Sequence, residues 1–333
     1  MVVVFTFIAG WLGVVAYRRY AMSAAILDVP NSRSSHVNPT PRGAGLIFVV
    51  LSVGVWGGLS VGGYIEWSYA APFLLSLVLT AGVGFYDDLA GASPLLRLAV
   101  QTIAVIISLL AFPSLPEIQW FGWSTPWPPV VFSILLLTLV WLVNLFNFMD
   151  GIDGIAGVET VSVLGGGILL LLVGDGEAYA LYPLVLMAAV AGFLMLNWPP
   201  AKVFMGDVGS GFLGLAIGLI AIISAIETQV NLWCWLILMS VFIADATMTL
   251  MRRIFRGQRF YEAHRSHAYQ RLSRRWNSHA KVTGLLLAFN LLVLFPLAMM
   301  VMYWPQSGAA IFILTLGGLM AGAWRCGAGT CDN

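Results

Sequence analysis

The chain is a succession of long apolar segments separated by short polar stretches, and this pattern constrains the fold more than any other feature. A bilayer core of roughly 30 Å requires ~20 mostly apolar helical residues to cross it. Hydrophobic residues make up 60% of the 333 residues and charged residues only 9%, which lies outside the usual range of soluble domains. The sequence therefore predicts an all-α, polytopic transmembrane helical bundle.

Eleven apolar runs are long enough to be interpreted as membrane spans. They cover about residues 1–17, 43–63, 70–86, 97–113, 129–147, 157–174, 178–197, 209–227, 231–250, 281–303 and 309–324. Because the seventh run is short, ten or eleven transmembrane helices are expected. Residues 1–333 are interpreted as a single integral membrane domain, since no large soluble segment remains.

The basic residues predict the orientation of these spans. No Lys or Arg precedes the first run, whereas Arg18 and Arg19 follow it, so we interpret it as a retained helix with its N-terminus outside. All 16 Lys and Arg residues then fall on the cytoplasmic side of a bacterial inner membrane, as the positive-inside rule requires. The C-terminus is also expected in the cytoplasm. Cytoplasmic loops are expected at about 18–42, 87–96, 148–156, 198–208 and 251–280.

Net charge and cysteine content exclude several classes of function. A formal net charge of +1 does not suggest a nucleic acid partner. Cys326 and Cys331 lie in a polar tail without a nearby histidine, which argues against a zinc site. Basic loops that contact anionic membrane lipids are expected instead. The spans leave open whether the protein is a monomer or a homodimer.

Acidic residues of the predicted cytoplasmic side gather at helix ends. They are Asp87, Asp88, Asp150, Asp153 and Asp207. Several anions at the edge of a low-dielectric membrane are costly unless cations neutralise them, so a divalent metal with nearby basic groups is predicted. Adjacent carboxylates cannot share one helical face, so Asp87 and Asp88 are expected to have different partners, one of them the metal.

Two glycine-containing motifs lie in these loops. NLFNFMDGIDGIAG spaces Asn144, Asn147, Asp150 and Asp153 by three residues, which predicts that they follow one side of a helical turn. KVFMGDVGSGFLG is a glycine-rich turn that enters a helix, where free backbone N–H groups suit phosphate. In this second motif, Phe204 can stack on a nucleobase or can serve packing alone.

Two further loops carry basic residues and histidines. If the segment after residue 263 is helical, His264, His267 and Arg271 share one face, and cations there suit a pyrophosphate. Arg265 lies one residue round the turn and is a further candidate. The first loop offers Arg33, His36 and Arg42 for anion contacts.

Taken in order, four motifs resemble one known family. DD at 87–88, NxxNxxDGxDG at 144–154, FxGDxGS at 204–210 and the histidine-containing basic loop at 264–267 are similar to those of the polyprenyl-phosphate N-acetylhexosamine-1-phosphate transferases, the glycosyltransferase 4 family. The resemblance implies transfer of an N-acetylaminosugar 1-phosphate from a UDP-sugar to undecaprenyl phosphate, with release of UMP. It also implies a requirement for Mg²⁺, with Mn²⁺ as a substitute.

The resemblance also implies roles for individual residues. Asp207 would bind the metal, with Asp87 and Asp88 beside the metal and the lipid phosphate. Asn147, Asp150 and Asp153 would face the nucleotide sugar, and Phe204 would lie near the uracil. The HRSH order, and a first loop without lysine, depart from the muramyl-pentapeptide branch and resemble the branch that initiates O-antigen and similar surface polysaccharides.

Phosphoryl transfer depends mainly on positioning and charge neutralisation. Because a phosphate monoester is already mostly ionised at neutral pH, no strong general base is required, and His264 and His267 are predicted to stabilise pyrophosphate charge. Direct attack and a covalent intermediate on Asp87 both remain open. The main rival interpretation is a transporter or flippase, which would place polar groups near the bilayer midplane; Asp245 alone hints at this. A CDP-alcohol phosphotransferase would need a DGxxAR motif that the chain lacks.

Overall fold

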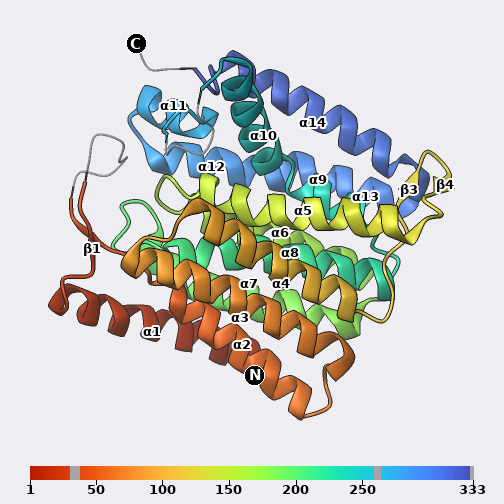
Figure 1. The fold of residues 1–333 in the computed structure, drawn as a ribbon, viewed down its shortest axis with the longest axis horizontal. Helices are drawn as coiled ribbons and strands as arrows, with labels where there is room; N and C mark the ends of the chain where they lie inside the picture. Colours follow the sequence, from red (N-terminus) through yellow and green to blue (C-terminus); the bar gives the residue numbers. More distant parts are fainter. Residues whose placement is uncertain (31–37, 259–263, 331–333) are drawn as a thin grey trace.

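The computed structural model describes residues 1–30, 38–258 and 264–330. It is a bundle of helices that run in alternating directions and are joined by short connections (Figure 1). In chain order the long helices are α1 (Val2–Ser23), α2 (Gly45–Val61), α3 (Trp67–Ala90), α4 (Pro94–Ala111), α5 (Pro128–Met149), α6 (Ile155–Val173), α7 (Leu181–Asn197), α8 (Asp207–Glu227), α10 (Ser240–Phe255) and α14 (Gly308–Arg325).

Shorter elements complete the chain. They are the helices α9 (Leu232–Leu238), α11 (Ala268–Trp276), α12 (His279–Phe289) and α13 (Phe295–Tyr303), the π-helical turn η2 (Asn290–Leu294), and the 3₁₀ turns η1 (Glu177–Ala180) and η3 (Pro305–Ser307). Two small antiparallel hairpins pair β1 (Leu27–Asp28) with β2 (Thr40–Pro41) and β3 (Gln119–Trp120) with β4 (Trp123–Ser124). The predicted all-α membrane fold is confirmed.

All eleven predicted apolar runs form helices. Within the described residues, nine helical segments are long and apolar enough to cross a membrane, and α2 is an apolar helix of 17 residues. The ninth run differs from a simple span, because α9 and α10 meet at a bend of 72° around Met239. The protein is therefore a multi-pass membrane protein.

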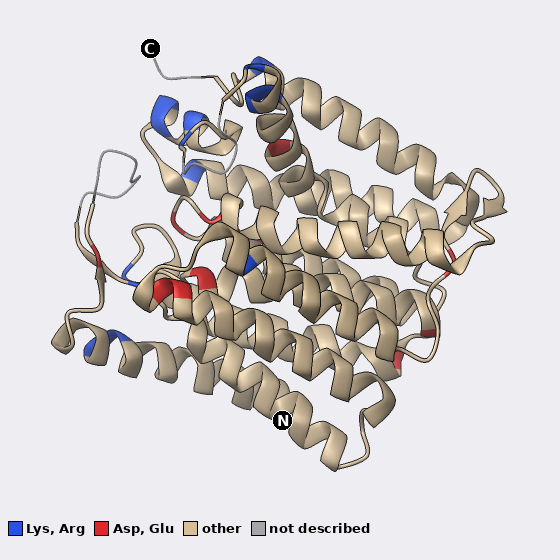
Figure 2. Ribbon diagram, viewed as in Figure 1, with Lys and Arg blue, Asp and Glu red and all other residues tan. Residues whose placement is uncertain are grey.

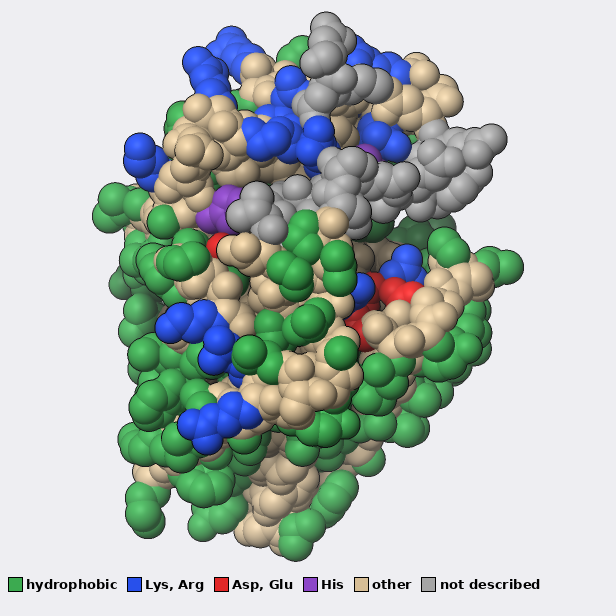
Figure 3. All heavy atoms as spheres, turned by 90° about the vertical axis from the view of Figure 1, so that its left-hand side faces the viewer, with side chains coloured by type: hydrophobic (Ala, Val, Ile, Leu, Met, Phe, Trp, Pro, Cys, Tyr) green, Lys and Arg blue, Asp and Glu red, His purple; other side chains and the backbone are tan. Residues whose placement is uncertain are grey.

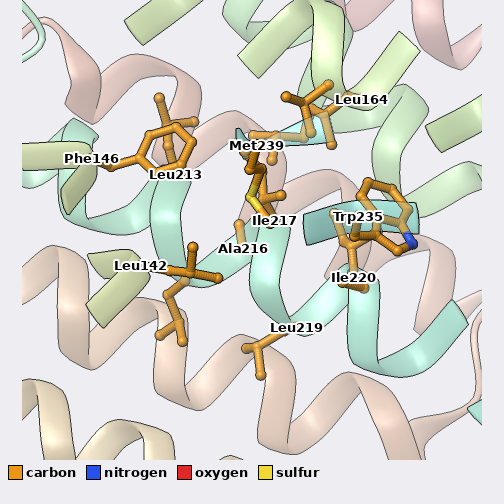
Figure 4. Close-up of a cluster of buried hydrophobic side chains, with 14 of the residues drawn as sticks. Leu142, Phe146, Leu164, Leu213, Ala216, Ile217, Leu219, Ile220, Trp235 and Met239 are labelled. Carbon is orange, nitrogen blue, oxygen red and sulfur yellow. The ribbon is translucent and has the colours of Figure 1, made fainter. Parts of the chain in front are cut away.

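Helix α8 lies at the centre of the bundle. In its most apolar window 89% of the residues are buried inside the protein, compared with 17% in α1 and α14. Glycines let α5 approach it closely, since a Cβ at Gly214 would lie 2.4 Å from the Leu142 carbonyl oxygen. Small residues commonly serve this purpose between membrane helices. Side chains of α5, α6, α8 and α9 meet around Ile217 and Trp235 in Figure 4.

Charge separates the two ends of the bundle. The described Lys and Arg residues gather at the end that holds β1 and α11, and the charged residues described at the opposite end are acidic (Figure 2). At that opposite end, Glu227 accepts hydrogen bonds from the hydroxyls of Tyr69 and Tyr179. The helices thus bring the predicted cytoplasmic loops to one end of the molecule, as the charge pattern requires.

Candidate active site at the basic end of the bundle

Three predicted carboxylates meet where α3 ends and α8 begins. Asp87 and Asp88 lie in the last turn of α3, and Asp207 is the first residue of α8. The two helices touch at Gly84, where a Cβ would lie 2.4 Å from the carbonyl oxygen of Asp207. Because glycine alone fits there, a residue 119 positions away in sequence comes within hydrogen-bonding distance of Asp88.

Asp88 caps the N-terminus of α8. Its two carboxylate oxygens accept hydrogen bonds from the backbone N–H groups of Asp207 (2.9 Å) and Val208 (3.0 Å). Such a contact satisfies free helix N–H groups and places negative charge at the positive end of the helix dipole. The predicted role of this helix start in phosphate binding therefore needs correction, because Asp88 already occupies these two donors.

Gly206 makes this cap possible. Its φ of +75° is strained for residues with a side chain. A Cβ there would also lie 2.4 Å from Asp88 Oδ2. The glycine of the FMGD motif is thus explained by the close approach of Asp88.

Two arginines bridge the three carboxylates. Arg42 Nη2 lies 2.8 Å from Asp88 Oδ1 and 2.8 Å from Asp207 Oδ1. Arg97 Nη1 lies 2.7 Å from Asp87 Oδ2 and 2.7 Å from Asp207 Oδ2. When all are ionised, three carboxylates against two guanidinium groups leave one negative charge. We call these five residues the carboxylate–arginine cluster.

From the sequence, Arg42 is only one of several candidate anion contacts, and Arg97 has no predicted role. A signal for Arg97 did exist, because it is the one basic residue in the short segment after the Asp87–Asp88 pair and lies in the first turn of α4, where the helix dipole disfavours a cation. Burial acts to lower the pKa of Arg42, but the charges of Asp88 and Asp207 outweigh it and raise this pKa above its usual value.

Backbone pairing holds Arg42 in place. Phe204 N–H donates to the Pro41 carbonyl (2.8 Å), and Ala44 N–H donates to the Phe204 carbonyl (2.9 Å). The hydroxyl of Tyr17 donates to the Arg42 carbonyl at 2.7 Å. The segment before α8 and the segment before α2 therefore form one rigid rim, in which the Phe204 side chain is half-buried.

The four polar residues predicted to line one side of a helical turn begin within the last turns of α5 and do not share one set of partners. Asn147 faces α8, where its Nδ2 donates to Ser210 Oγ at 3.2 Å. Asp150 directly follows α5, and burial first and the charge of Asp207 second raise its pKa well above the usual range. Asn144 instead donates to Gln101 on α4 at 3.1 Å.

Asp153 contacts different segments of the chain. One of its carboxylate oxygens accepts from Ala201 N–H (3.0 Å) and lies 3.2 Å from His279 Nδ1. His279 begins α12 and was not predicted. Residues 150–154, which we call the DGIDG loop, are thus joined to the segment before α8 and to α12 through Asp153.

The histidine loop differs from its prediction. Helix α11 begins at Ala268, with His267 as its N-cap, so His264, His267 and Arg271 do not share one helical face. The two imidazole rings nevertheless stack, with centroids 5.0 Å apart. Burial, followed by the charges of His267 and Arg253, lowers the pKa of His264 to about 3. In this arrangement His264 is neutral and does not supply the predicted positive charge.

Asp245 holds the start of α11 in place. Its carboxylate accepts from the backbone N–H groups of Ala268 and Tyr269, both at 2.9 Å, and lies 3.3 Å from His267 Nδ1. The Tyr269 hydroxyl then donates to the Phe148 carbonyl at 2.9 Å. The intramembrane acid therefore anchors α11 beside the DGIDG loop.

The remaining predicted residues lie at the edges of the site. Arg265 is half-buried, and its carbonyl accepts from Arg274 at 3.1 Å. Arg33 and His36 lie outside the described residues. Figure 3 looks onto this end of the bundle and shows acidic and basic side chains together in a recess, with further basic side chains toward its upper edge.

The donor chemistry of the cluster fits a hard divalent cation. Within the described ranges, no three Asp, Glu, His or Cys side chains are spaced to hold a metal ion. Mg²⁺, however, usually takes only one or two carboxylates and completes its shell with water and phosphate oxygens. Asp207, which contacts both arginines, and Asp88 are the residues that could hold it.

Comparison with known proteins connects this site to a chemistry. The model of glycosyl transferase family 4 matches residues 70–225, which include Asp87, Asp88, Asp207 and the DGIDG loop. The chain is 28% identical over 269 residues to a probable undecaprenyl-phosphate N-acetylglucosaminyl 1-phosphate transferase of Bacillus subtilis, with 77% of this chain and 72% of the relative covered.

Two other relatives extend the comparison. A decaprenyl-phosphate N-acetylglucosaminephosphotransferase of Mycobacterium leprae is 27% identical over 342 residues, which cover 92% of this chain and 83% of the relative. A phospho-N-acetylmuramoyl-pentapeptide-transferase of a Synechococcus species is 29% identical over 261 residues, which cover 73% of this chain and 69% of the relative. The names of the first two relatives contain a polyprenyl phosphate.

Proposed function

Because the model of glycosyl transferase family 4 matches residues 70–225 and the relatives align over most of the chain, we propose that it transfers an N-acetylaminosugar 1-phosphate from a UDP-sugar to undecaprenyl phosphate. The products are UMP and undecaprenyl-diphosphate-sugar. The observation that carries the proposal is the carboxylate–arginine cluster at the basic end of a multi-pass membrane bundle. A lipid phosphate and a water-soluble nucleotide can meet at such a membrane boundary.

The proposed reaction is a substitution at phosphorus. An oxygen of the lipid phosphate attacks the β-phosphorus of the UDP-sugar, a new P–O bond forms, and the P–O bond to UMP breaks. Since the attacking phosphate is already mostly ionised at neutral pH, alignment and charge compensation are the main tasks of the protein. Arg42 and Arg97 fit the second task, because guanidinium groups bind phosphate oxygens in a bidentate way.

Asp88 and Asp207 are the proposed metal ligands. Bound Mg²⁺, or Mn²⁺ as a substitute, would neutralise charge on the transferred phosphoryl group. The arginines contact the carboxylate oxygens that would hold the metal. With the metal bound there, the arginines would be placed to turn toward substrate phosphates. Asn147 and Asp150 face the same region and are proposed to contact the nucleotide sugar. We keep Phe204 as the proposed contact to uracil, and His267 and Arg265 as proposed pyrophosphate contacts.

Direct transfer is favoured over a covalent intermediate on Asp87. One carboxylate oxygen of Asp87 accepts from Ala92 N–H at 2.6 Å, and the other lies 2.7 Å from Arg97. A carboxylate held by donors on both oxygens is a weaker nucleophile, because the donors stabilise its negative charge. Asp87 is therefore assigned to positioning Arg97.

The biological role proposed is the first membrane step of O-antigen or related cell-envelope polysaccharide synthesis, at the cytoplasmic face of the inner membrane. The first-loop motif PNSRSSH and the segment HRSHAYQRL support this choice of branch. Two relatives carry N-acetylglucosamine in their names, so this sugar is the first donor to test. The mass of the detergent complex distinguishes a monomer from a homodimer.

The deciding experiment measures UMP released by the detergent-purified protein with undecaprenyl phosphate, Mg²⁺ and a series of UDP-N-acetylaminosugars. We expect lipid-dependent UMP from one donor, abolished by a chelator. Asp207→Ala should lower the rate about 10²–10³-fold, the range for losing a group that stabilises transition-state charge. Asp175→Asn, at the opposite end of the bundle, serves as the matched control and should keep the rate. Folded protein without UMP release from any donor would favour the transporter or flippase.

A further inference from the structure

A second acidic residue lies inside the membrane bundle, and its described contacts are with residues outside the carboxylate–arginine cluster. Glu159 lies in the second turn of α6 and has no exposed surface. Among the described residues it forms no ion pair, and its carboxylate accepts a hydrogen bond from Asn290, with Nδ2 2.7 Å from Glu159 Oε2. An ionised carboxylate without a cation is strongly disfavoured in such surroundings.

The hydrogen bonds of this group are incomplete in a specific way. Asn290 Nδ2 also donates to Ser162 Oγ at 2.7 Å, so both of its hydrogens are used. Glu159 Oε1 and Asn290 Oδ1 are both buried and both lack a donor. The carboxyl and the amide are both planar and already share one hydrogen bond. A single proton on the carboxyl can therefore satisfy both of the remaining acceptors.

Reversing the amide gives the same result. The nitrogen and oxygen of an asparagine side chain are assigned from their hydrogen bonds. With Oδ1 turned toward Glu159, two acceptors would face each other at the 2.7 Å separation of these atoms, unless Glu159 carried a proton. The reversed orientation therefore requires a protonated carboxyl, and in the first orientation a proton on the carboxyl supplies the donor that Glu159 Oε1 and Asn290 Oδ1 lack.

The position of Asn290 connects this pair to the candidate site. Asn290 begins the π-helical turn η2 that follows α12, and π-helical turns are frequent at functional positions. His279 and Thr283 precede it by eleven and seven residues, a spacing that places all three on one face. His279 contacts the Asp153 carboxylate, and Thr283 Oγ1 donates to the Asp153 carbonyl at 3.0 Å.

From this geometry we infer that Glu159 is held as a neutral carboxylic acid which donates a hydrogen bond to Asn290, and that this pair fixes α12 against α6. Helix α6 begins directly after the DGIDG loop, and α12 contacts the same loop through Asp153. Glu159 and Asn290 are therefore positioning residues: they hold the loop that carries Asp150 without touching a substrate.

The protonation state is tested directly by infrared spectroscopy of the full-length protein in nanodiscs. The wild-type minus Glu159→Gln difference spectrum should contain the carbonyl stretch of a protonated carboxylic acid, present at both pH 5 and pH 7. Asp175→Asn removes an acidic residue from the opposite end and should not affect this band. A difference spectrum that contains carboxylate bands instead would overturn the inference.

The fixing of α12 is tested by thermal unfolding. Glu159→Gln should keep the Tm, because an amide supplies both a donor and an acceptor to Asn290. Glu159→Leu and Asn290→Leu should each lower the Tm by leaving one partner unsatisfied. The double variant should recover most of the loss, since both polar groups are then removed. Equal losses in Glu159→Gln and Glu159→Leu, or additive losses in the double variant, would contradict the pair.

The positioning role is tested kinetically, and this part alone rests on the proposed function. Glu159→Leu should lower kcat/KM for the UDP-sugar about tenfold to hundredfold per folded protein, as expected for a misplaced site, and Glu159→Gln should restore it. The double variant should recover Tm but not kcat/KM if α12 is no longer held in its position. Recovery of both would overturn the positioning role. The infrared and thermal results do not depend on which reaction the protein catalyses.

Discussion

Individual residues in the candidate site are explained by partners that are far away in sequence. Asp207 contacts Arg42, 165 residues earlier, and Arg97, 110 residues earlier. Asp88 is nearly buried, with a side-chain exposure of 5%, and faces one of these arginines. Charges at this boundary are thus stabilised in groups, so removing one member affects the others.

Arg97→Ala should reduce the rate of UMP release about 10²–10³-fold, because Asp87 and Asp207 lose the cation that bridges them. Arg97→Lys should recover only a small part, since an ammonium lacks the planar fork of a guanidinium. Steady-state kinetics of the purified variants provide the measurement, with the exposed Arg275→Ala as control. An Arg97→Ala enzyme as active as wild type would exclude Arg97 from the site.

His264 allows a prediction about pH. Its pKa is lowered to about 3, first by burial and then by the charges of His267 and Arg253, with Asp245 opposing them. A histidine whose folded pKa lies below its unfolded value of about 6.5 favours folding above that unfolded value and disfavours it as the pH falls. The Tm of the wild type should therefore fall between pH 7 and 5. In His264→Gln, which cannot be protonated, the fall should be smaller, whereas an identical fall would contradict a neutral, buried His264.

At the scale of elements, the bent pair α9 and α10 is the main departure from a simple series of spans. The bend lies at Met239, and the helix that follows carries Asp245 to the N-terminus of α11. A carboxylate at this position neutralises free N–H groups and the positive end of the helix. Because α11 has only nine residues, it depends on such tertiary contacts.

Asp245→Ala should release α11 without disrupting the transmembrane bundle. The amides of Ala268 and Tyr269 lose their acceptors, so their hydrogen exchange should accelerate at least tenfold, equivalent to about 1.4 kcal/mol of local stability. Exchange measured by mass spectrometry on peptides from α11 gives the answer. Peptides from α8 serve as the internal reference, and unchanged exchange in α11 would show that Asp245 does not anchor it.

For the whole molecule, charge separation predicts the orientation in the membrane. The described basic residues lie at one end of the bundle (Figure 2). The positive-inside rule then places this end, with the candidate site, in the cytoplasm. The N-terminus is predicted on the opposite side from the C-terminus, because eleven apolar helical segments separate them.

Cysteine labelling in intact spheroplasts tests this orientation. In a background with Cys326 and Cys331 replaced by serine, Ser124→Cys in the exposed β3–β4 hairpin should react with a membrane-impermeant maleimide. Arg275→Cys, at the basic end, should react only after the membrane is permeabilised. Cys234 is buried and should remain unlabelled in both. The reverse pattern would invert the topology.

The sequence by itself determined the membrane fold, the approximate spans, the sorting of charge and the identity of most candidate site residues. These features are local, because a bilayer selects apolar runs of a given length and loop charge is counted along the chain. Tertiary structure decided which charges meet: Arg97 with Asp87 and Asp207, Asp153 with His279, Asp245 with α11, and Glu159 with Asn290. Those pairings depend on how closely helices pack, as at Gly84, and spacing along one segment does not specify the partner on another.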